Sequence, residues 1–165
     1  MNASSMEALG PPPFRFTPSA GPCMEGPAFS PVFKLLATGL VFGTAFWLVH
    51  LWMGGKVVGG LVSILSWFLA GLAIMLYTWW WIVRSRTRLD TQALYQSWMW
   101  DKKMELRELA YGKVIRVRGL DWLIAPRLYV RTLTGKFAVF YAADPGLISE
   151  FERMVVELKA FRALD

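Results

Sequence analysis

LLATGLVFGTAFWLVHLWM, residues 35–53, is a run of nineteen residues without a single Asp, Glu, Lys or Arg. After Gly54-Gly55-Lys56, a second uncharged run, VVGGLVSILSWFLAGLAIMLYTWWWIV, fills residues 57–83. A bilayer core of about 30 Å needs roughly 20 apolar helical residues. Both runs meet that length, so the sequence predicts a transmembrane hairpin within residues 33–83.

The chain on either side of the hairpin differs in composition. Seven of the nine prolines lie among residues 11–31, together with many Gly and Ser residues. Segments of this kind bury too little apolar surface to fold alone. We therefore expect residues 1–32 to be a disordered Pro/Gly-rich tail, and residues 84–165 to form one small folded domain.

The charge distribution predicts the orientation of the hairpin. Residues 84–165 hold fifteen of the eighteen Lys and Arg residues, and the first of them follow the second run directly. Lys and Arg near membrane ends favour the cytoplasmic side, and Trp favours the interface. The sequence thus predicts two cytoplasmic termini and an interface built by Trp79, Trp80, Trp81, Arg84, Arg86 and Arg88. The same cations also suit contact with anionic lipid headgroups.

Gly39 and Gly43 form a GxxxG pattern in the first run. Small residues at this spacing allow two helix backbones to approach closely. We expect this face to pack against the second helix of the hairpin, with a seam between two copies of the protein as the alternative.

The chain from residue 84 onward changes to short alternating stretches. We expect strands at 93–100, 104–109 and 113–118, with a polar turn at Asp101-Lys102-Lys103. Residues 127–133 and 136–142 alternate apolar and polar side chains around Thr134-Gly135, a pattern typical of a β-hairpin.

A helix is predicted at the end of this domain. Asp144 suits an N-cap and Pro145 suits the first helical position. Apolar residues from Leu147 to Phe161 recur every three or four positions, which indicates an amphipathic helix of about 16–18 residues. Its polar face mixes both signs of charge, unlike the basic face of interfacial helices, so we expect it to pack on the sheet.

The combination resembles the bacterial pleckstrin-homology-like (PH-like) membrane proteins. The features that carry the resemblance are the membrane hairpin, its arginine-flanked exit, the paired strands of 127–142 and the helix that opens at Asp144-Pro145, spanning residues 35–161. The resemblance implies an α+β PH-like fold, a small antiparallel β-sandwich or barrel capped by a C-terminal helix. It also implies a bacterial cytoplasmic (inner) membrane and a binding or scaffolding role, but it does not imply phosphoinositide binding.

Few residues in the chain suit catalysis. Cys23 and His50 are each the only residue of their type, which argues against Cys/His metal sites. No GxxxxGK[ST] phosphate loop is present. Pairs of carboxylates, such as Glu105 with Glu108, suit solvated surfaces better than general acid–base work. We therefore expect no enzyme, no metal and no cofactor.

The remaining candidates are two surfaces. The basic residues of the predicted strands and turns would share one outer face, which is either simply solvated or binds lipid headgroups or a protein partner: Lys102, Lys103, Arg116, Arg118, Arg127, Arg131 and Lys136. Nucleic acid is not expected, because residues 84–165 carry fifteen Lys and Arg against ten Asp and Glu, a net charge of only +5. Trp98, Trp100 and Trp122 are expected in the core, or otherwise in the headgroup layer.

The sequence thus predicts a non-enzymatic, membrane-anchored binding or scaffold protein that presents a PH-like domain at the cytoplasmic membrane surface. Lipid and a protein partner are the expected ligands. The alternative is an accessory subunit that docks on a larger membrane complex through its transmembrane helices.

Overall fold

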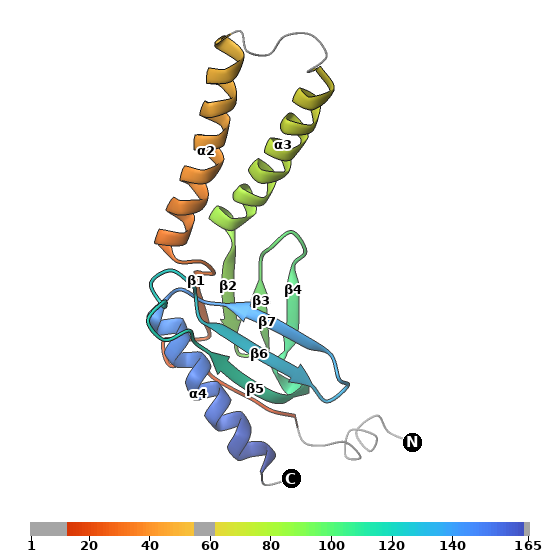
Figure 1. Ribbon diagram of the computed structural model, residues 1–165. Helices are drawn as coiled ribbons and strands as arrows, with labels where there is room; N and C mark the ends of the chain where they lie inside the picture. Colours follow the sequence, from red (N-terminus) through yellow and green to blue (C-terminus); the bar gives the residue numbers. More distant parts are fainter. Residues whose placement is uncertain (1–12, 55–61, 164–165) are drawn as a thin grey trace. The chain divides into compact units, whose positions relative to one another are not determined.

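The structure is a computed structural model that describes residues 13–54 and 62–163, with the backbone alone at 62–64. The chain divides into two compact units (Figure 1). One unit is Pro31–Arg84, and the other, the β domain, combines the chain before residue 31 with the chain from Ser85 onward. The helical unit agrees with the hairpin expected at residues 33–83, but it interrupts the β domain, because residues 23–27 before it pair with a strand after it.

Two helices build the helical unit, α2 (Pro31–Met53) and α3 (Val62–Arg84). Both are long and apolar enough to cross a membrane. The helix α2 starts earlier than expected, at Pro31, whose missing amide hydrogen costs nothing in the first turn. The expected start of the second helix at Val57 lies outside the described residues.

Polar and aromatic contacts join the two helices near their shared end. The indole Nε1 of Trp79 donates to Thr38 Oγ1 at 2.8 Å, and the Trp79 ring meets Phe42 edge-on at 5.4 Å. The ammonium of Lys34 donates to the carbonyl of Val83 at 3.0 Å. These contacts explain why the helices form a hairpin.

The β domain contains two antiparallel sheets (Figure 1). Sheet A has the order β1 (Cys23–Pro27), β2 (Arg86–Asp90), β3 (Ala93–Gln96) and β4 (Lys102–Glu105). Sheet B has the order β5 (Leu109–Ile115), β6 (Arg127–Thr132) and β7 (Phe137–Tyr141), and the short 3₁₀ helix η2 (Leu106–Glu108) links the two sheets.

The strand β1 joins the domain across the whole helical unit. Pro27 lies opposite Arg86 and Cys23 lies opposite Asp90, so β1 pairs along the full length of β2. The chain thus leaves sheet A after β1 and returns to it at β2.

The predicted strands are partly confirmed. The hairpin around Thr134-Gly135 is confirmed as β6 and β7, and Gly135 supplies the positive φ of +85° that its turn requires. The other boundaries shift. Residues 97–100 bend away after β3, residues 102 and 103 belong to β4 rather than to a turn, and residues 116–118 follow the end of β5.

The C-terminal helix is confirmed as α4 (Pro145–Arg162), which has 18 residues. Asp144 caps it, since its Oδ2 accepts a hydrogen bond from the amide of Leu147 at 2.9 Å. Leu147, Phe151 and Leu158 are at most 1% exposed and belong to the core of the β domain. The helix therefore packs on the sheets, as predicted.

The expected disordered tail is wrong for residues 13–30. Besides β1, this segment places Phe14 and Phe16 in the core at 3% and 2% exposure. Its backbone is held to α4, where Glu150 accepts hydrogen bonds from the amide and hydroxyl of Ser19, and Arg153 donates to the carbonyl of Thr17 at 2.6 Å. A proline-rich segment that cannot build its own core can still complete the core of the domain that follows. Residues 1–12 lie outside the described part of the chain.

Candidate functional site: the outer face of sheet B

The strands of sheet B present two unlike faces. Leu128, Val130 and Phe140 are fully buried and point into the domain core. On the same side, a Cβ added to Gly112 would lie 3.1 Å from Val155 of α4, so glycine permits the close approach of the helix. Because successive strand residues point to opposite faces, the intervening residues form the other surface, the outer face of sheet B: Tyr111, Lys113, Ile115, Arg127, Tyr129, Arg131, Phe137, Val139 and Tyr141.

Strand register arranges these nine residues in three rows across the sheet. The rows are Tyr111–Arg131–Phe137, Lys113–Tyr129–Val139 and Ile115–Arg127–Tyr141. Each cation therefore has an aromatic side chain directly opposite it.

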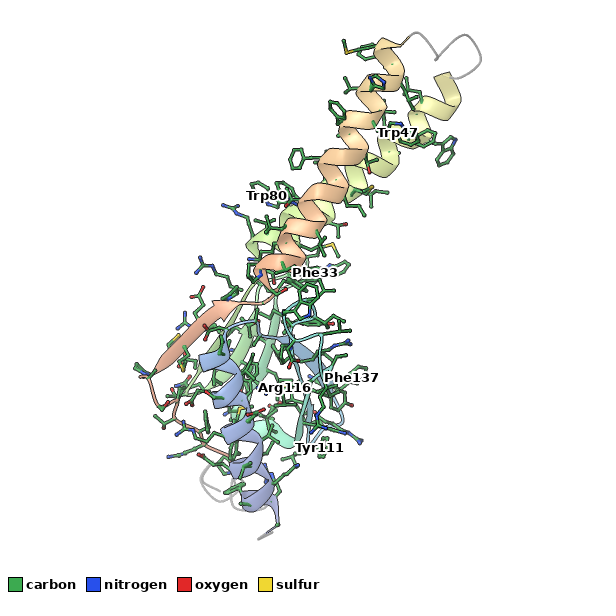
Figure 2. All side chains as sticks on the ribbon, turned by 60° about the vertical axis from the view of Figure 1, so that its left-hand side comes forward. Phe33, Trp47, Trp80, Tyr111, Arg116 and Phe137 are labelled. Carbon is green, nitrogen blue, oxygen red and sulfur yellow. The ribbon has the colours of Figure 1, made fainter. Side chains whose placement is uncertain are left out.

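The aromatic rings contact one another along the diagonals of this pattern. The rings of Tyr111 and Tyr129 lie 6.5 Å apart, and those of Tyr129 and Phe137 lie 6.3 Å apart and nearly parallel. Tyr111 and Phe137 are 45% and 71% exposed. Figure 2 shows both on the side of the domain away from α4. The guanidinium of Arg127 lies 6.0 Å from the Tyr141 ring. The rings of Tyr111, Tyr129 and Phe137 thus form a continuous row that solvent reaches at both ends, whereas Tyr141 stacks on Phe29 at 5.5 Å.

The outer face of sheet B carries charge of one sign. The sequences of β5, β6 and β7 contain no Asp or Glu. Within residues 13–54 and 62–163, the structure shows no ion pair to Lys113, Arg127 or Arg131. The face therefore combines apolar contact area with cations that have no anionic partner among these residues.

The predicted basic residues do not share one face. Arg127 and Arg131 lie together on the outer face of sheet B, but Arg116 lies beside α4 and pairs with Glu152 at 3.2 Å (Figure 2). Arg118 lies exposed in the loop after β5. The strand expected at 113–118 ends at Ile115, which is why the alternation assigned to these two arginines fails.

The three lysines of the predicted set form a separate group. Lys102, Lys103 and Lys136 line one open hollow between β4 and the β6–β7 turn, where Phe137 also lies. Lys102 donates to the carbonyl of Val139 at 3.3 Å. Lys103 lies 4.0 Å from Glu105 and 5.6 Å from the Tyr95 ring. Two of the three thus already have partners within the domain.

Sequence analysis missed Tyr111, Lys113, Tyr129 and Phe137. The signal was present, because Tyr111 and Lys113 alternate with the inward-facing Gly112 and Val114. Reading β5 from residue 113 instead of 109 hid this alternation. The aromatic character of the face therefore became apparent only from the pairing of the strands.

The predicted membrane-interface residues belong to both units. Trp79 faces α2 rather than the outside of the hairpin, since it binds Thr38. Trp80 is 49% exposed under the guanidinium of Arg84, which lies 4.5 Å from its ring, and Trp81 is half-buried. Arg86 and Arg88 are not part of the helix exit but lie on β2, paired with Glu25 and Asp90 at 3.2 Å each.

The glycine face of α2 does not pack within the hairpin. Among the described residues, and apart from the backbone of α2 itself, no atom lies within 4 Å of a Cβ added to Gly39 or Gly43, and both residues are exposed. The expectation that they pack against the second helix is wrong, because Thr38, Phe42 and Lys34 make the contacts with α3 instead.

Two of the three tryptophans expected in the core are exposed. Trp98 is half-buried and its ring lies 5.2 Å from that of Phe29. Trp100 and Trp122 are 76% and 58% exposed. Leucine and phenylalanine of the sheets and α4 fill the core without them.

Three carboxylates of the β domain have structural partners, among them Glu105, which pairs with Arg107 at 2.6 Å. Asp144 caps α4, and Glu150, 5% exposed, accepts from Ser19 and pairs with Arg153 at 2.6 Å. Burial alone would raise the pKa of Glu150, but hydrogen bonds from Ser19 and Arg153 outweigh it and lower that pKa below its usual value. Among the described residues, no group of three or more His, Cys, Asp or Glu side chains is placed to hold a metal ion.

Comparisons of the chain with protein-family models, with curated proteins and with solved structures find no match. The function is therefore inferred from the geometry of the described residues. The outer face of sheet B is the strongest candidate for a binding surface.

Proposed function

We propose that this protein is a non-enzymatic, membrane-anchored binding protein of the bacterial inner membrane. In this proposal α2 and α3 span the bilayer, and a PH-like β domain with both chain termini lies in the cytoplasm. The length and apolar character of the two helices support the anchor. Arg84 at the end of α3 and Lys34 in the first turns of α2 support a cytoplasmic location for that end of the hairpin.

The arrangement of the β domain supports the PH-like assignment. Four antiparallel strands and then three form two sheets in chain order, and one C-terminal helix packs against them. This order of sheets and helix is compatible with the small β-sandwich and capping helix that the resemblance implies, and it supports the proposal. The helical unit is then an insertion between the first two strands.

The outer face of sheet B is the proposed binding surface, and its partner is an acidic protein segment that also carries apolar side chains. The observation that carries this proposal is the alternation of exposed aromatic rings with cations that have no ion pair within residues 13–54 and 62–163, on strands that contain no acid. Carboxylates of a partner would pair with Lys113, Arg127 and Arg131, and its apolar side chains would cover Tyr111 and Phe137. Interfaces favour this combination of Arg and aromatic side chains. The modest net charge of the domain favours a protein over nucleic acid.

A direct binding assay tests the proposal. The full chain is reconstituted in nanodiscs of neutral phosphatidylcholine and titrated with a fluorescein-labelled peptide of repeated Glu-Glu-Leu units. We expect salt-sensitive binding by fluorescence anisotropy, and much weaker binding of a Ser-Ser-Leu repeat. The double variant Lys113→Glu/Arg131→Glu should weaken binding about tenfold, whereas Arg88→Glu on the outer face of sheet A should leave it unchanged.

Two results would contradict this function. Equal binding by the wild type and the double variant would remove the face from the site. Tighter binding of oligothymidylate than of the acidic peptide would identify a nucleic-acid surface instead.

If the acidic peptide binds as expected, the natural partner can be identified next. A photo-crosslinking amino acid placed at Phe137 in native membranes would capture that partner for mass spectrometry.

The exposed glycine face of α2 favours a second candidate, an accessory subunit of a membrane complex. Gly39 and Gly43 have no neighbour among the described residues of the hairpin, and small residues at this spacing suit another transmembrane helix. Gly39→Leu should release such a partner from complexes extracted in mild detergent, and should leave binding of the acidic peptide unchanged. Retention of every co-purifying protein by this variant would exclude the second candidate.

A further inference from the structure

Two loops of the β domain are hydrogen-bonded to Ser30 and Ser85, the residues that directly precede α2 and directly follow α3. The loop of residues 97–101 joins β3 to β4, and the loop of residues 116–126 joins β5 to β6. Ser97 donates its amide to the carbonyl of Arg86 at 2.9 Å, and Ser85 Oγ donates to the carbonyl of Ser97 at 2.6 Å. Ser30 Oγ donates to the carbonyl of Leu123 at 2.9 Å. Both loops, here named the junction loops, are therefore tied to the two residues that flank the helical unit.

The junction loops are unusually apolar for surface loops. Their sequences are SWMWD and RVRGLDWLIAP. Trp100, Trp122 and Leu120 are 76%, 58% and 39% exposed. Leu120 and Trp122 are thus exposed two residues apart in one junction loop and Trp100 in the other, so each loop presents large apolar surface to its surroundings.

The nearly neutral charge of the junction loops favours a lipid partner over a strongly acidic or strongly basic protein. Asp101 and Asp121 offset the exposed Arg118, and Arg116 already pairs with Glu152. The surface is thus nearly neutral, and the amphipathic indole rings dominate it. Tryptophan prefers the headgroup level of a bilayer, where its apolar body and its N–H group are both accommodated.

The covalent connections leave little distance between these loops and the ends of the helices. Ser85 alone separates Arg84, the last residue of α3, from Arg86, the first of β2. Residues 28–30 separate β1 from α2. Since a residue spans at most about 3.6 Å, a bilayer crossed by α2 and α3 lies within a few residues of the segments that hold both loops.

We propose that Trp100, Leu120 and Trp122 insert into the headgroup layer of the bilayer that α2 and α3 span, so that the β domain is held against the membrane at both junction loops. This inference rests on the membrane anchor of the proposed function but not on the acidic partner. It assigns the loops to the lipid surface and leaves the outer face of sheet B to the protein partner.

Depth-dependent quenching in liposomes tests the insertion. In a Cys23→Ser background of the full chain, single cysteines at Leu120, Thr134 and Phe46 are labelled with an NBD fluorophore. Phosphatidylcholine brominated near the top of its acyl chains, with and without phosphatidylglycerol, serves as the quencher. We expect the probe at residue 120 to lose most of its fluorescence in both lipid mixtures. The probe at residue 134, at the opposite end of β6, should be unquenched.

The probe at residue 46 separates failure of the anchor from failure of the inference. Deep bromination should quench it, because Phe46 lies on α2 and is 75% exposed. If it is quenched while the probe at 120 is not, the helices span the membrane but the loop insertion is overturned. If neither is quenched, the anchor itself fails.

A second variant pair tests the role of the indole rings. Trp100→Ser/Trp122→Ser should lower the quenching at residue 120 to the level at residue 134, and the matched change Tyr111→Ser on sheet B should not. Quenching at residue 120 that is unaffected by loss of both rings would overturn the inference. Quenching that requires phosphatidylglycerol would also overturn it, since the contact would then be electrostatic.

Discussion

The outer faces of the two sheets are built alike and carry their charges differently. On sheet A, every basic residue that points outward from a strand has an acidic neighbour: Arg86 with Glu25, Arg88 with Asp90 and Lys103 with Glu105. On sheet B the cations alternate with aromatic rings, and the strands contain no acid.

The difference shows why alternation alone does not identify a binding surface. Both sheets follow the same period-two pattern, which determines only which side chains point outward. Exposed ion pairs satisfy each other's charge and make a solvated face. Unpaired cations beside exposed aromatics leave both the charge and the apolar area available to a partner. The pairing state of the charges, rather than their number, separates the two faces.

The largest expected effect is on stability, which should fall much more for a substitution on the inner face of β6 than for one on its outer face. Leu128 is fully buried, so Leu128→Ala should lower the free energy of unfolding by about 2–5 kcal/mol. Tyr129→Ala, on the outer face, should lower it by only about 1 kcal/mol. Equilibrium urea unfolding in detergent micelles, followed by circular dichroism, measures both. Equal losses would mean that the outer face is part of a core and not a surface.

A buried ion pair should contribute more than the exposed pairs of sheet A. Glu150→Gln removes the carboxylate that holds Ser19 and Arg153, and should cost about 1–3 kcal/mol. Because the folded pKa is lowered, this stabilisation is fully present above the unfolded pKa of about 4.3 and disappears as the pH falls through the lower folded value. The same unfolding assay, repeated at pH 7 and at a pH below about 4, should show the difference between wild type and variant shrinking at the acid pH.

Charge reversal on the outer face of sheet B should act on binding and not on folding. Lys113→Glu/Arg131→Glu should weaken binding of the acidic peptide about tenfold, the equivalent of about 1.4 kcal/mol, because each exposed pair contributes up to about 1 kcal/mol. Anisotropy titration gives this ratio, and the unfolding curve of the variant should match that of the wild type. A large loss of stability would show that these side chains belong to the fold.

The smallest effect is expected on sheet A. Lys103→Ala removes a contact 4.0 Å from Glu105 by a side chain that is 56% exposed, and should change stability by less than about 1 kcal/mol. Peptide binding should be unchanged. A clear loss of binding would extend the site from the outer face of sheet B into the hollow that Lys103 lines with Lys136.

Local features of the fold were predictable because their signals lie within a few residues. The Asp144 cap, Pro145 and the spacing of the apolar residues in α4 all act inside one helix. The turn at Thr134-Gly135 likewise joins neighbouring strands. These elements form where the sequence predicts them.

The candidate site was only half predictable. Arg127 and Arg131 were identified from their alternation in β6, but Lys113 was missed and Arg116 was assigned to the wrong surface. The acidic partner of Arg116 lies in another element, at Glu152 of α4. Nothing near Arg116 in the chain indicates that pair.

By itself, the sequence determined the two long apolar helices, the hairpin of sheet B and the capped helix α4, because hydropathy, turn chemistry and capping are local properties. The tertiary structure alone decided that β1 pairs with β2 across the helical unit, and that Phe14 and Phe16 complete the core. It also decided which cations lack an acidic neighbour. These properties depend on contacts between residues far apart in the chain. The composition of a proline-rich segment therefore does not determine whether it joins the core, and the presence of a basic residue does not determine whether it is paired.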